Sequence, residues 1–459
     1  MADFSITDFG AVADGATLNT EAIDRAIEAA SAVGGRVVIP AGGIFLSGSI
    51  LLRGAIEFHL EEGAHLKASA RYEDYLPQHQ IPEITGKTVV EEVLPIRSFI
   101  SAFEAHGLSI TGRGMIDGNA DGFIAERGKY IHSMRGPVGG RSQYLERPFT
   151  IFLIGCDAVD IQDVTIKDPA FWALRLTGCN DSAITGISIL TDLMVPNADG
   201  IDIDRCQNVQ ITRCTLVTAD DCISLKSCCG TSQYGAVRNV FVSQCFMKST
   251  SGAITLGTES VGTIENVIVT DCIVKDTHRG FAVRAREGGL ISNVVFENSI
   301  VETRAFSESW WGHGEALHVT AFSWDDPNKQ WNPEHGNVER QLEGKVDGIK
   351  FSNIRVLSEA AILVWAAHQE LLKNVEFNRL SVTMRKTSKW PPRIDLRPNP
   401  IIDFVREKPS AFTLRNVENV AILNTEINWD QQTQSQYAKA IDVENVKGLY
   451  THNVTFEQP

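Results

Sequence analysis

Apolar residues recur along the chain in one spacing that is repeated many times. From about residue 105, apolar positions fall at offsets 3, 5, 8 and 10 from a starting residue. Copies of this template start at Cys156, Cys206, Val237, Ile264, Ile291, Val346, Leu372, Val417 and Val446. Alternation with a period of two is typical of strands, and self-similarity every ~20 to 50 residues is typical of a solenoid. Because no helical period runs inside the copies, the pattern predicts a stack of β coils.

The period is about 23 to 31 residues; the steps from Cys156 to Cys206 and from Leu372 to Val417 are longer, and there is a double step between Ile291 and Val346. That step predicts an inserted loop at about 302–345. The residue before the first apolar position is often asparagine, as at Asn208, Asn239, Asn266, Asn293, Asn374 and Asn419. Asparagine tolerates a left-handed backbone and forms stacked side-chain hydrogen bonds, so we expect these residues to share one turn of successive coils.

A second strand can be aligned in each coil. Its triplets are Leu174-Arg175-Leu176, Ile201-Asp202-Ile203, Ile223-Ser224-Leu225, Ile254-Thr255-Leu256, Phe281-Ala282-Val283 and Leu317-His318-Val319. The first and third residues are apolar and are predicted to point inward, whereas the middle residue varies and is predicted to point outward. We expect a groove along the stack, lined by the residues that lie just before and just after this strand.

The N-terminal region has a helical pattern before the coils begin. Asn19 or Thr20 can cap a helix, and Gly34 and Gly35 end it. Its apolar positions are Ile23, Ala26, Ile27 and Ala30. The first coil of a stack would otherwise expose its core, so the helix is predicted to cover it. We expect an all-β solenoid, a parallel β-helix with an N-terminal capping helix, forming a single domain over residues 1–459 with the cap and first coils in about 1–70.

Composition and charge narrow the function. Hydrophobic residues at 43% and charged residues at 22% are typical of a globular protein. The net charge of -15 argues against nucleic acid as a partner, because that binding requires clustered Lys and Arg. No apolar stretch approaches the ~20 residues that span a membrane, and the N-terminus lacks the pattern of a secretory signal. We therefore expect no membrane partner and a cytoplasmic protein, or a secreted one if a leader was removed; the sequence does not define the oligomeric state.

The nine cysteines lie in strand patterns and not in metal-type pairs. Cys206, Cys214, Cys222, Cys245 and Cys272 are interpreted as small core residues in preference to disulfides. Cys228 and Cys229 are adjacent, and the pattern gives them no role. A removed leader would reopen the question of disulfides.

Three carboxylates stand out against the strand pattern. Asp220 and Asp221 follow Asp199 by 21 and 22 residues, which matches about one coil. If the coils stack about 4.8 Å apart, the three side chains converge and cannot all ionise independently. A protonated acid beside ionised neighbours is suited to glycoside hydrolysis. Each aspartate alone is readily explained as a turn residue, but the shared register favours a site.

Other side chains flank the same strand. Trp172 and Ser251 precede it, and Arg284 and Arg286 follow it. The arginines could hold a substrate carboxylate or could be a solvated strand edge. Trp172 could be exposed for sugar stacking or could be part of the core. We also assign Asn197 and Lys226, which delimit the stretch that carries the aspartates, to substrate binding.

Three long segments, Arg71–Ile96, Gly118–Arg147 and Trp310–Lys345, could close one end of the groove. In the last one, Trp310, Trp311, His313 and Glu315 are candidates for substrate contact, and ordinary packing explains them equally well. The spacing of His278, His313 and His318 does not specify a metal, so these histidines are interpreted as surface or packing residues.

These motifs resemble those of a known family. NADGID (Asn197 to Asp202) and ADDCISLKS (Ala219 to Ser227) resemble the two aspartate motifs of glycoside hydrolase family 28, the polygalacturonases and their relatives. The segments DFGAVADG and GGRVVIPAG resemble its N-terminal signature. The resemblance implies a right-handed, single-stranded parallel β-helix of the pectin-lyase-like type and an inverting hydrolase of pectic, uronate-containing chains, without metal or other cofactor. It makes Asp220 the general acid, with Asp199 and Asp221 activating water.

The chain departs from the family at two positions. The family histidine is replaced by Ser251 and the family lysine by Arg286. Ser251 takes no charge near neutrality, so any tuning that the histidine gives to the acid is lost or supplied elsewhere. We expect an exo-acting member that cleaves oligosaccharide ends. The alternatives are a non-catalytic β-helical carbohydrate-binding protein, and a lyase or transferase on the same scaffold, for which the aspartates could bind calcium.

Overall fold

The computed structural model describes residues 1–76, 97–130, 134–137, 147–307, 311–323, 343–397, 404–405 and 407–459. Nearly all regular structure in this part of the chain is parallel β-sheet, in which each strand pairs with its equivalent in the next coil. The predicted parallel β-helix with an N-terminal helix is confirmed. The chain divides into two compact units, Met1–Asp220 with Gly230–Gly235, and Asp221–Cys229 with Ala236–Pro459.

In the first unit the strands form three columns, numbered in the order in which the chain passes through them. The first column is β5 (Ile50–Leu52), β8 (Ser98–Phe103), β13 (Phe149–Ile154), β16 (Leu174–Thr177) and β19 (Ile201–Asp204). The second is β1 (Asp3–Ser5), β3 (Arg36–Ile39), β6 (Glu57–Leu60), β9 (Ser109–Gly112), β14 (Asp160–Gln162), β17 (Asn180–Thr185) and β20 (Gln207–Thr212). The third is β2 (Asp14–Leu18), β4 (Ile44–Ser47), β7 (His65–Ala68), β10 (Met115–Asp117), β15 (Thr165–Lys167), β18 (Ser188–Leu190) and β21 (Thr215–Thr218). Strands β11 (Ile124–Tyr130) and β12 (Met134–Pro137) form an antiparallel hairpin.

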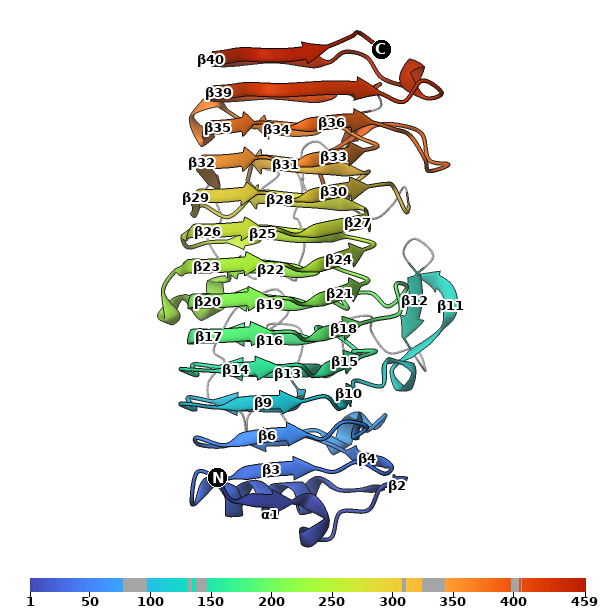
Figure 1. The fold of residues 1–459 in the computed structure, drawn as a ribbon, viewed down its shortest axis with the longest axis vertical. Helices are drawn as coiled ribbons and strands as arrows, with labels where there is room; N and C mark the ends of the chain where they lie inside the picture. The colour runs from blue at the N-terminus through green and yellow to red at the C-terminus, as the bar shows by residue number, and fades with distance from the viewer. Residues whose placement is uncertain are drawn as a thin grey trace. The chain divides into compact units, whose positions relative to one another are not determined.

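The helix α1 (Thr20–Ser31) lies beside β3 at the N-terminal end of this unit (Figure 1). Its predicted apolar positions, Ile23, Ala26, Ile27 and Ala30, are fully buried, so the capping helix is confirmed. Asn19 is the N-cap residue, but its side chain donates to the backbone carbonyls of Val12, Thr17 and Leu46 and makes no bond to the helix. The short 3-10 helices η1 (Ile6–Phe9), η2 (Tyr72–Asp74) and η4 (Ala120–Gly122) connect strands in this unit.

The second unit repeats the three columns. The first is β22 (Ile223–Ser227), β25 (Gly252–Ser260), β28 (Arg279–Ala285), β31 (Glu315–Ala321), β34 (Ile362–Ala366) and the start of β39 (Phe412–Trp429). The second is β23 (Val237–Ser243), β26 (Ile264–Thr270), β29 (Leu290–Glu297), β32 (Lys345–Ser352), β35 (Leu372–Asn378) and the middle of β39. The third is β24 (Phe246–Ser249), β27 (Ile273–Thr277), β30 (Ile300–Thr303), β33 (Arg355–Ser358), β36 (Ser381–Met384) and the end of β39. The last strand, β40 (Ile441–Phe456), pairs with β39 along all three columns.

Shorter elements complete the second unit. Strands β37 (Ile394–Asp395) and β38 (Phe404–Val405) pair antiparallel, and η9 (Gln369–Leu371) and η10 (Gln434–Gln436) are single 3-10 turns. The turn η7 (Cys229–Tyr234) includes the short segment that belongs to the first unit. Figure 1 shows the second column of this unit as a regular stack of strands from β23 to β35.

The aligned triplets have the predicted register within each unit. Leu174 pairs with Ile201 in the first unit. In the second, Phe281 pairs with both Ile254 and Leu317. The segment at 302–345, expected to be an inserted loop, therefore contains a column strand, β31, in its described part. One copy of the template escaped the sequence count: it starts at Cys179, and its first position is the polar Ser182.

Because the coils repeat, equivalent core side chains and equivalent turn asparagines stack on one another. Phe351 stacks between Phe296 and Phe377, with ring centroids 5.1 and 5.2 Å apart. The predicted asparagines all have a left-handed backbone, and Asn266 donates to Asn239 and accepts from Asn293. All nine cysteines are described and none forms a disulfide. Those assigned to the core are buried, as predicted.

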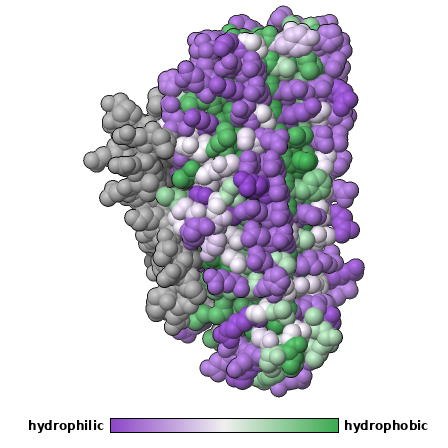
Figure 2. Space-filling view, turned by 90° about the vertical axis from the view of Figure 1, so that its left-hand side faces the viewer, coloured by the Kyte–Doolittle hydropathy of each residue, from purple (hydrophilic) through white to green (hydrophobic). Residues whose placement is uncertain are grey.

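Hydrophilic residues dominate the face seen in Figure 2, with hydrophobic patches between them. Within the described ranges, no helix is long and apolar enough to cross a membrane.

Candidate active site

Asp221, one of the predicted site residues, has a carboxylate that is contacted by three donors. It lies two residues before β22, is 5% exposed, and its Oδ1 accepts from the Ser251 hydroxyl at 3.1 Å and from the Gly252 amide at 2.9 Å. The other oxygen, Oδ2, lies 3.4 Å from Nη2 of Arg284. Hydroxyl, amide and guanidinium donors thus hold this carboxylate in one orientation.

Gly252 is required for this arrangement. A Cβ at this position would lie 2.4 Å from Oδ1 of Asp221, so any side chain would displace the carboxylate or the turn. The turn itself is set by the amide of Ser251, which donates to the Ser249 hydroxyl at 2.8 Å. The sequence thus places a glycine where the backbone must approach an acid closely.

Asp199 and Asp220 belong to the first unit. Asp199 lies two residues before β19 and is 4% exposed, whereas Asp220 follows β21 and is half-buried. The backbone carbonyl of Asp220 accepts from the Thr218 hydroxyl, and that of Asp199 accepts from the amide of Ala173. Asp199 and Asp220 thus lie in turns next to strands, and convergence with Asp221 remains a prediction.

Asn197 also lies in this turn, with a left-handed backbone (φ 53). Its Oδ1 accepts from Arg147, which donates as well to the carbonyls of Pro196 and Ala170, at 2.6 and 3.0 Å. Arg147 fixes the turn that leads to Asp199, but the repeat pattern does not point to it, because it lies 50 residues before Asn197 and outside any copy of the template.

Trp172 corrects one prediction. It is only 5% exposed and belongs to an aromatic cluster, stacking on Phe171 at 5.6 Å and meeting Phe149 edge-on. The expected exposed sugar-stacking face is therefore wrong, and the core interpretation holds. The stacking partners could not be inferred from alternation, because Trp172 lies in a turn.

Arg284 and Arg286 differ although they are two residues apart. Arg284 is 5% exposed and contacts Asp221, whereas Arg286 is fully buried and donates to Oγ1 of Thr320 at 2.9 Å. Burial, together with the charges of Arg284 and Arg279, holds the pKa of Arg286 well below its usual value. The expected grip of Arg286 on a substrate carboxylate is therefore wrong, because its guanidinium is in the interior, over the Phe322 ring.

Lys226 and Ser251 are both buried within the second unit. Nζ of Lys226 lies 3.1 Å from Oε2 of Glu259, whose side chain is 21% exposed. Glu259 was not predicted from the sequence, since it occupies an irregular stretch of β25 that the triplet alignment does not cover. Lys226, Glu259, Arg284 and Asp221 place charges of both signs along the first column of this unit.

The middle residues of the aligned triplets are predicted to point outward, but the structure buries them. The middle residues of the aligned triplets, Arg175, Asp202, Ser224, Thr255, Ala282 and His318, are all fully buried. Arg175 forms an ion pair of 3.1 Å with Asp204, which also accepts from Thr231. Apart from Ala282, these side chains are therefore polar groups in the interior.

The three histidines are buried, in agreement with a packing role. Nδ1 of His278 lies 3.0 Å from the Thr250 carbonyl, and burial lowers the pKa of His278 to about 3. Burial also lowers the pKa of His313 to about 4 and holds that of His318 well below its usual value. Neutral imidazoles thus pack beside the cations of this column.

The long segments proposed as walls are only partly described. Trp310 and residues 77–96, 131–133, 138–146, 308–310 and 324–342 lie outside the described residues. Trp311 is 36% exposed, whereas Glu315 is buried, 3.5 Å from Arg279 and bonded to the His313 amide. The packing interpretation therefore holds for His313 and Glu315. Among the residues that the structure covers, no group of three or more His, Cys, Asp or Glu is arranged to hold a metal ion.

Fold and site together define a parallel β-helix protein in which a carboxylate is held by hydroxyl, amide and guanidinium donors. The chain belongs to the glycosyl hydrolases family 28, whose sequence profile matches residues 36–305. The resemblance seen in the aspartate motifs is confirmed.

Individual relatives agree with this assignment. The chain is 32% identical over 236 residues to a probable polygalacturonase of Vitis vinifera, covering 50% of this chain and 45% of the relative. It is 24% identical over 287 residues to an exo-poly-alpha-D-galacturonosidase of Dickeya chrysanthemi, covering 55% and 47%. The crystal structure of an exopolygalacturonase from Thermotoga maritima superposes with a TM-score of 0.67 at 20% identity over 93% of this chain and 91% of that one, which shows the shared fold. The chain spans about half the length of the curated relatives it matches.

Proposed function

We propose that the protein hydrolyses glycosidic bonds in pectic or other uronate-containing oligosaccharides with inversion at the anomeric carbon. The observation that carries this proposal is the Asp221 carboxylate, held by Ser251, Gly252 and Arg284 at a position that matches the family's aspartate motif. Membership of the family and the polygalacturonase names of the curated relatives support it.

In this mechanism Asp220 is the general acid. Its carboxyl proton passes to the glycosidic oxygen as the bond to the anomeric carbon breaks. Asp199 and Asp221 accept the proton of a water that attacks the opposite face of the ring, so one carboxylate is protonated as another is deprotonated. Asp220 is half-buried, whereas Asp199 and Asp221 are buried. Its greater exposure suits the acid, which must reach a leaving group.

The orientation of Asp221 explains how the base could work without the family histidine. Ser251 donates to Oδ1, and Arg284 faces Oδ2. The carboxylate therefore presents a fixed direction toward a water, which preorganises the site before the substrate binds. In this chain Ser251 supplies a hydrogen bond and not a titratable group.

Exo-action is the finer part of the proposal. It is supported by the name of the Dickeya chrysanthemi relative, an exo-poly-alpha-D-galacturonosidase. An exo-acting enzyme releases short products from chain ends at once, whereas an endo-acting enzyme first lowers the viscosity of a polymer solution. The ratio of reducing ends to viscosity loss separates the two modes.

The test incubates the full chain with a panel of uronate and neutral oligosaccharides and follows new reducing ends, ultraviolet absorbance and product anomers by NMR. We expect reducing ends from uronate substrates, an inverted first product and no absorbance from a new double bond. Asp220→Asn should lower the rate by about 10²- to 10⁴-fold, the usual contribution of general acid catalysis.

The matched control is Asp271→Asn, an exposed turn aspartate of the second unit with a left-handed backbone. It should leave the rate unchanged. Full activity of Asp220→Asn, a retained anomer or a double bond in the product would each contradict the mechanism. Binding without turnover would favour the non-catalytic alternative.

A further inference from the structure

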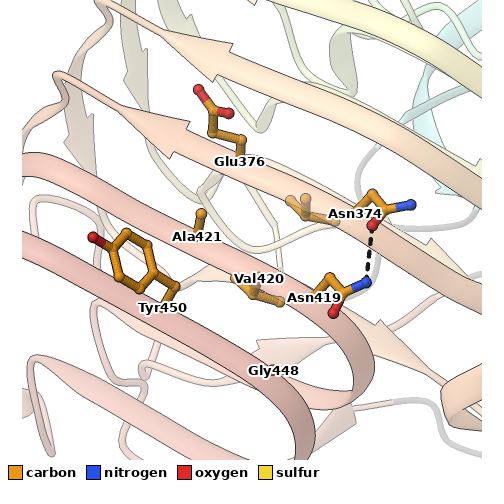
Figure 3. A pocket seen from close by; sticks show the side chains of 8 residues that line it. Asn374, Glu376, Asn419, Val420, Ala421, Gly448 and Tyr450 are labelled. Atoms are coloured by element: carbon orange, nitrogen blue, oxygen red, sulfur yellow. Dashed lines mark hydrogen bonds between the residues drawn. The ribbon is translucent and has the colours of Figure 1, made fainter.

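A hollow of about 370 Å³ lies on the second column of the second unit, close to the end of the chain (Figure 3). It is formed by β35, β39 and β40 and lies in a different column from Asp221 and Arg284. Its lining includes Asn374, Glu376, Asn419, Ala421, Gly448 and Tyr450. None of these residues takes part in the proposed hydrolysis.

Two small residues create this hollow. Ala421 pairs with Glu376 on one side and Tyr450 on the other, and earlier strands carry Lys350 or Ile268 at the equivalent position. Gly448 takes the next position in line after Asn374 and Asn419, since Glu418 pairs with Lys447 and Val420 with Leu449. The lack of side chains at these two places opens the surface between larger neighbours.

Gly448 also ends a run of amide hydrogen bonds. Asn419 donates to Oδ1 of Asn374 at 3.1 Å, but the next coil has no amide to donate to Oδ1 of Asn419. Gly448 has a left-handed backbone (φ 77), and a Cβ there would lie 2.7 Å from that oxygen. Within the described ranges, no group donates a hydrogen bond to Oδ1 of Asn419.

The other side of the hollow carries an aromatic ring and a carboxylate. Glu376 and Tyr450 flank Ala421 on the two neighbouring strands, and Figure 3 shows the bonded pair Asn374 and Asn419 further along these strands. Tyr450 is 61% exposed. Oε1 of Glu376 lies 3.2 Å from Nζ of Lys350, whereas Oε2 meets no donor from the part of the chain that the structure covers.

This combination matches the chemistry of a sugar ring. The C–H face of a pyranose packs on an aromatic ring, and its hydroxyls donate to carboxylate and amide oxygens. The volume is within the usual range for small-ligand sites, of about 300 to 1,000 Å³. A hollow that offers acceptors and one exposed ring therefore selects a ligand rich in hydroxyl donors.

Charge decides the kind of sugar. Lys350 pairs with Oε1 of Glu376, so a uronate in the hollow would bring its carboxylate toward Oε2, which the described residues leave unpaired, and like charges at short range repel. A neutral glycosyl unit has no such penalty. We infer that this hollow binds a neutral glycosyl unit of a polysaccharide, through stacking on Tyr450 and hydrogen bonds to Glu376 and Asn419, and so attaches the protein to a glycan other than the chain it cleaves.

The test is affinity electrophoresis of the full chain through native gels that contain a soluble β-glucan, an arabinan, a galactan or polygalacturonate. Because the hollow is shallow and has one ring, we expect retardation by at least one neutral polymer with a Kd on the order of 1 mM per site. Tyr450→Ala and Ala421→Leu, which remove the ring and fill the hollow, should each raise that Kd at least fivefold.

Two matched variants complete the experiment. Tyr450→Phe keeps the ring, and Phe456→Ala removes another exposed aromatic of β40 outside the hollow. Both should bind like the wild type. The three substituted positions lie on or near the surface of the last coils, so the unfolding temperature of each of the four variants and its rate on short uronate oligosaccharides should remain unchanged.

Several results would overturn the inference. They are no retardation by any neutral polymer, retardation that persists in both Tyr450→Ala and Ala421→Leu, and retardation by polygalacturonate that depends on Tyr450. The inference does not rest on the proposed hydrolysis, since retardation is measured without turnover.

Discussion

Replacement of Ser251 by alanine tests how the Asp221 carboxylate is held. The substitution removes one hydroxyl, which donates to Oδ1 of Asp221 at 3.1 Å, and leaves the Gly252 amide and Arg284 in place. A hydrogen bond to a charged group contributes about 1.5 to 3 kcal/mol. Two donors remain to orient the carboxylate, so we expect the lower end of this range, about 1.5 kcal/mol.

The lost hydrogen-bond energy can be expressed as a change in the catalytic rate. Each ~1.4 kcal/mol of barrier is a factor of about ten, so kcat/KM should fall about tenfold. The fall should appear mainly in kcat, because Ser251 contacts the proposed base and is 6% exposed. The assay is the initial rate of reducing-end formation on a uronate oligosaccharide over a range of concentrations.

Ser381→Ala is the matched control. Its hydroxyl also donates to a carboxylate, that of Glu426 at 2.6 Å, but this pair is exposed and lies on the third column. The control should keep its full rate, and both variants should keep an unchanged unfolding temperature within a few degrees. A kcat/KM of Ser251→Ala within about twofold of the wild type would refute the reasoning, because the hydroxyl would then contribute nothing to the orientation of the base.

Three further predictions concern stability. Phe351→Ala should lower the free energy of unfolding by about 3 to 5 kcal/mol, because it removes the middle ring of a buried stack; an unchanged midpoint in guanidinium chloride would contradict this. Asn266→Ala should lower the free energy of unfolding by about 1 to 2 kcal/mol, measured by thermal unfolding, because it removes two side-chain hydrogen bonds and places alanine in a left-handed conformation. Asn266→Gly should lower it less. Burial lowers the pKa of His278 to about 3, so the unfolded chain binds a proton at this histidine more readily than the folded chain does. The contribution of neutral His278 to stability is therefore present above about pH 6.5 and is lost as the pH falls toward 3. The unfolding temperature of His278→Gln should therefore fall less steeply over that window than that of the wild type, and equal slopes would contradict this account.

The fold could be predicted because the same signal is repeated in every coil. The asparagine turn at Asn239, Asn266 and Asn293 and the apolar positions beside it recur at a nearly constant step. An error at one coil, such as the missed copy at Cys179, does not change the alignment of the others. The glycines that shape a single place, Gly252 and Gly448, carry no repeated signal, so their roles required coordinates.

The exposure of the first column could not be predicted, because it depends on contacts between segments far apart in the sequence. Arg279 donates to the backbone carbonyls of Asp395 and Arg397, which lie 116 and 118 residues away. Arg147 reaches Asn197 across 50 residues. Alternation states which side of a strand faces the core, but it does not state whether another segment covers the opposite side. For that reason a residue such as Arg286 has the spacing of a substrate ligand and the environment of an interior cation. The contacts that orient the Asp221 carboxylate, from Ser251 and Gly252, likewise come from a neighbouring coil and not from its own strand pattern.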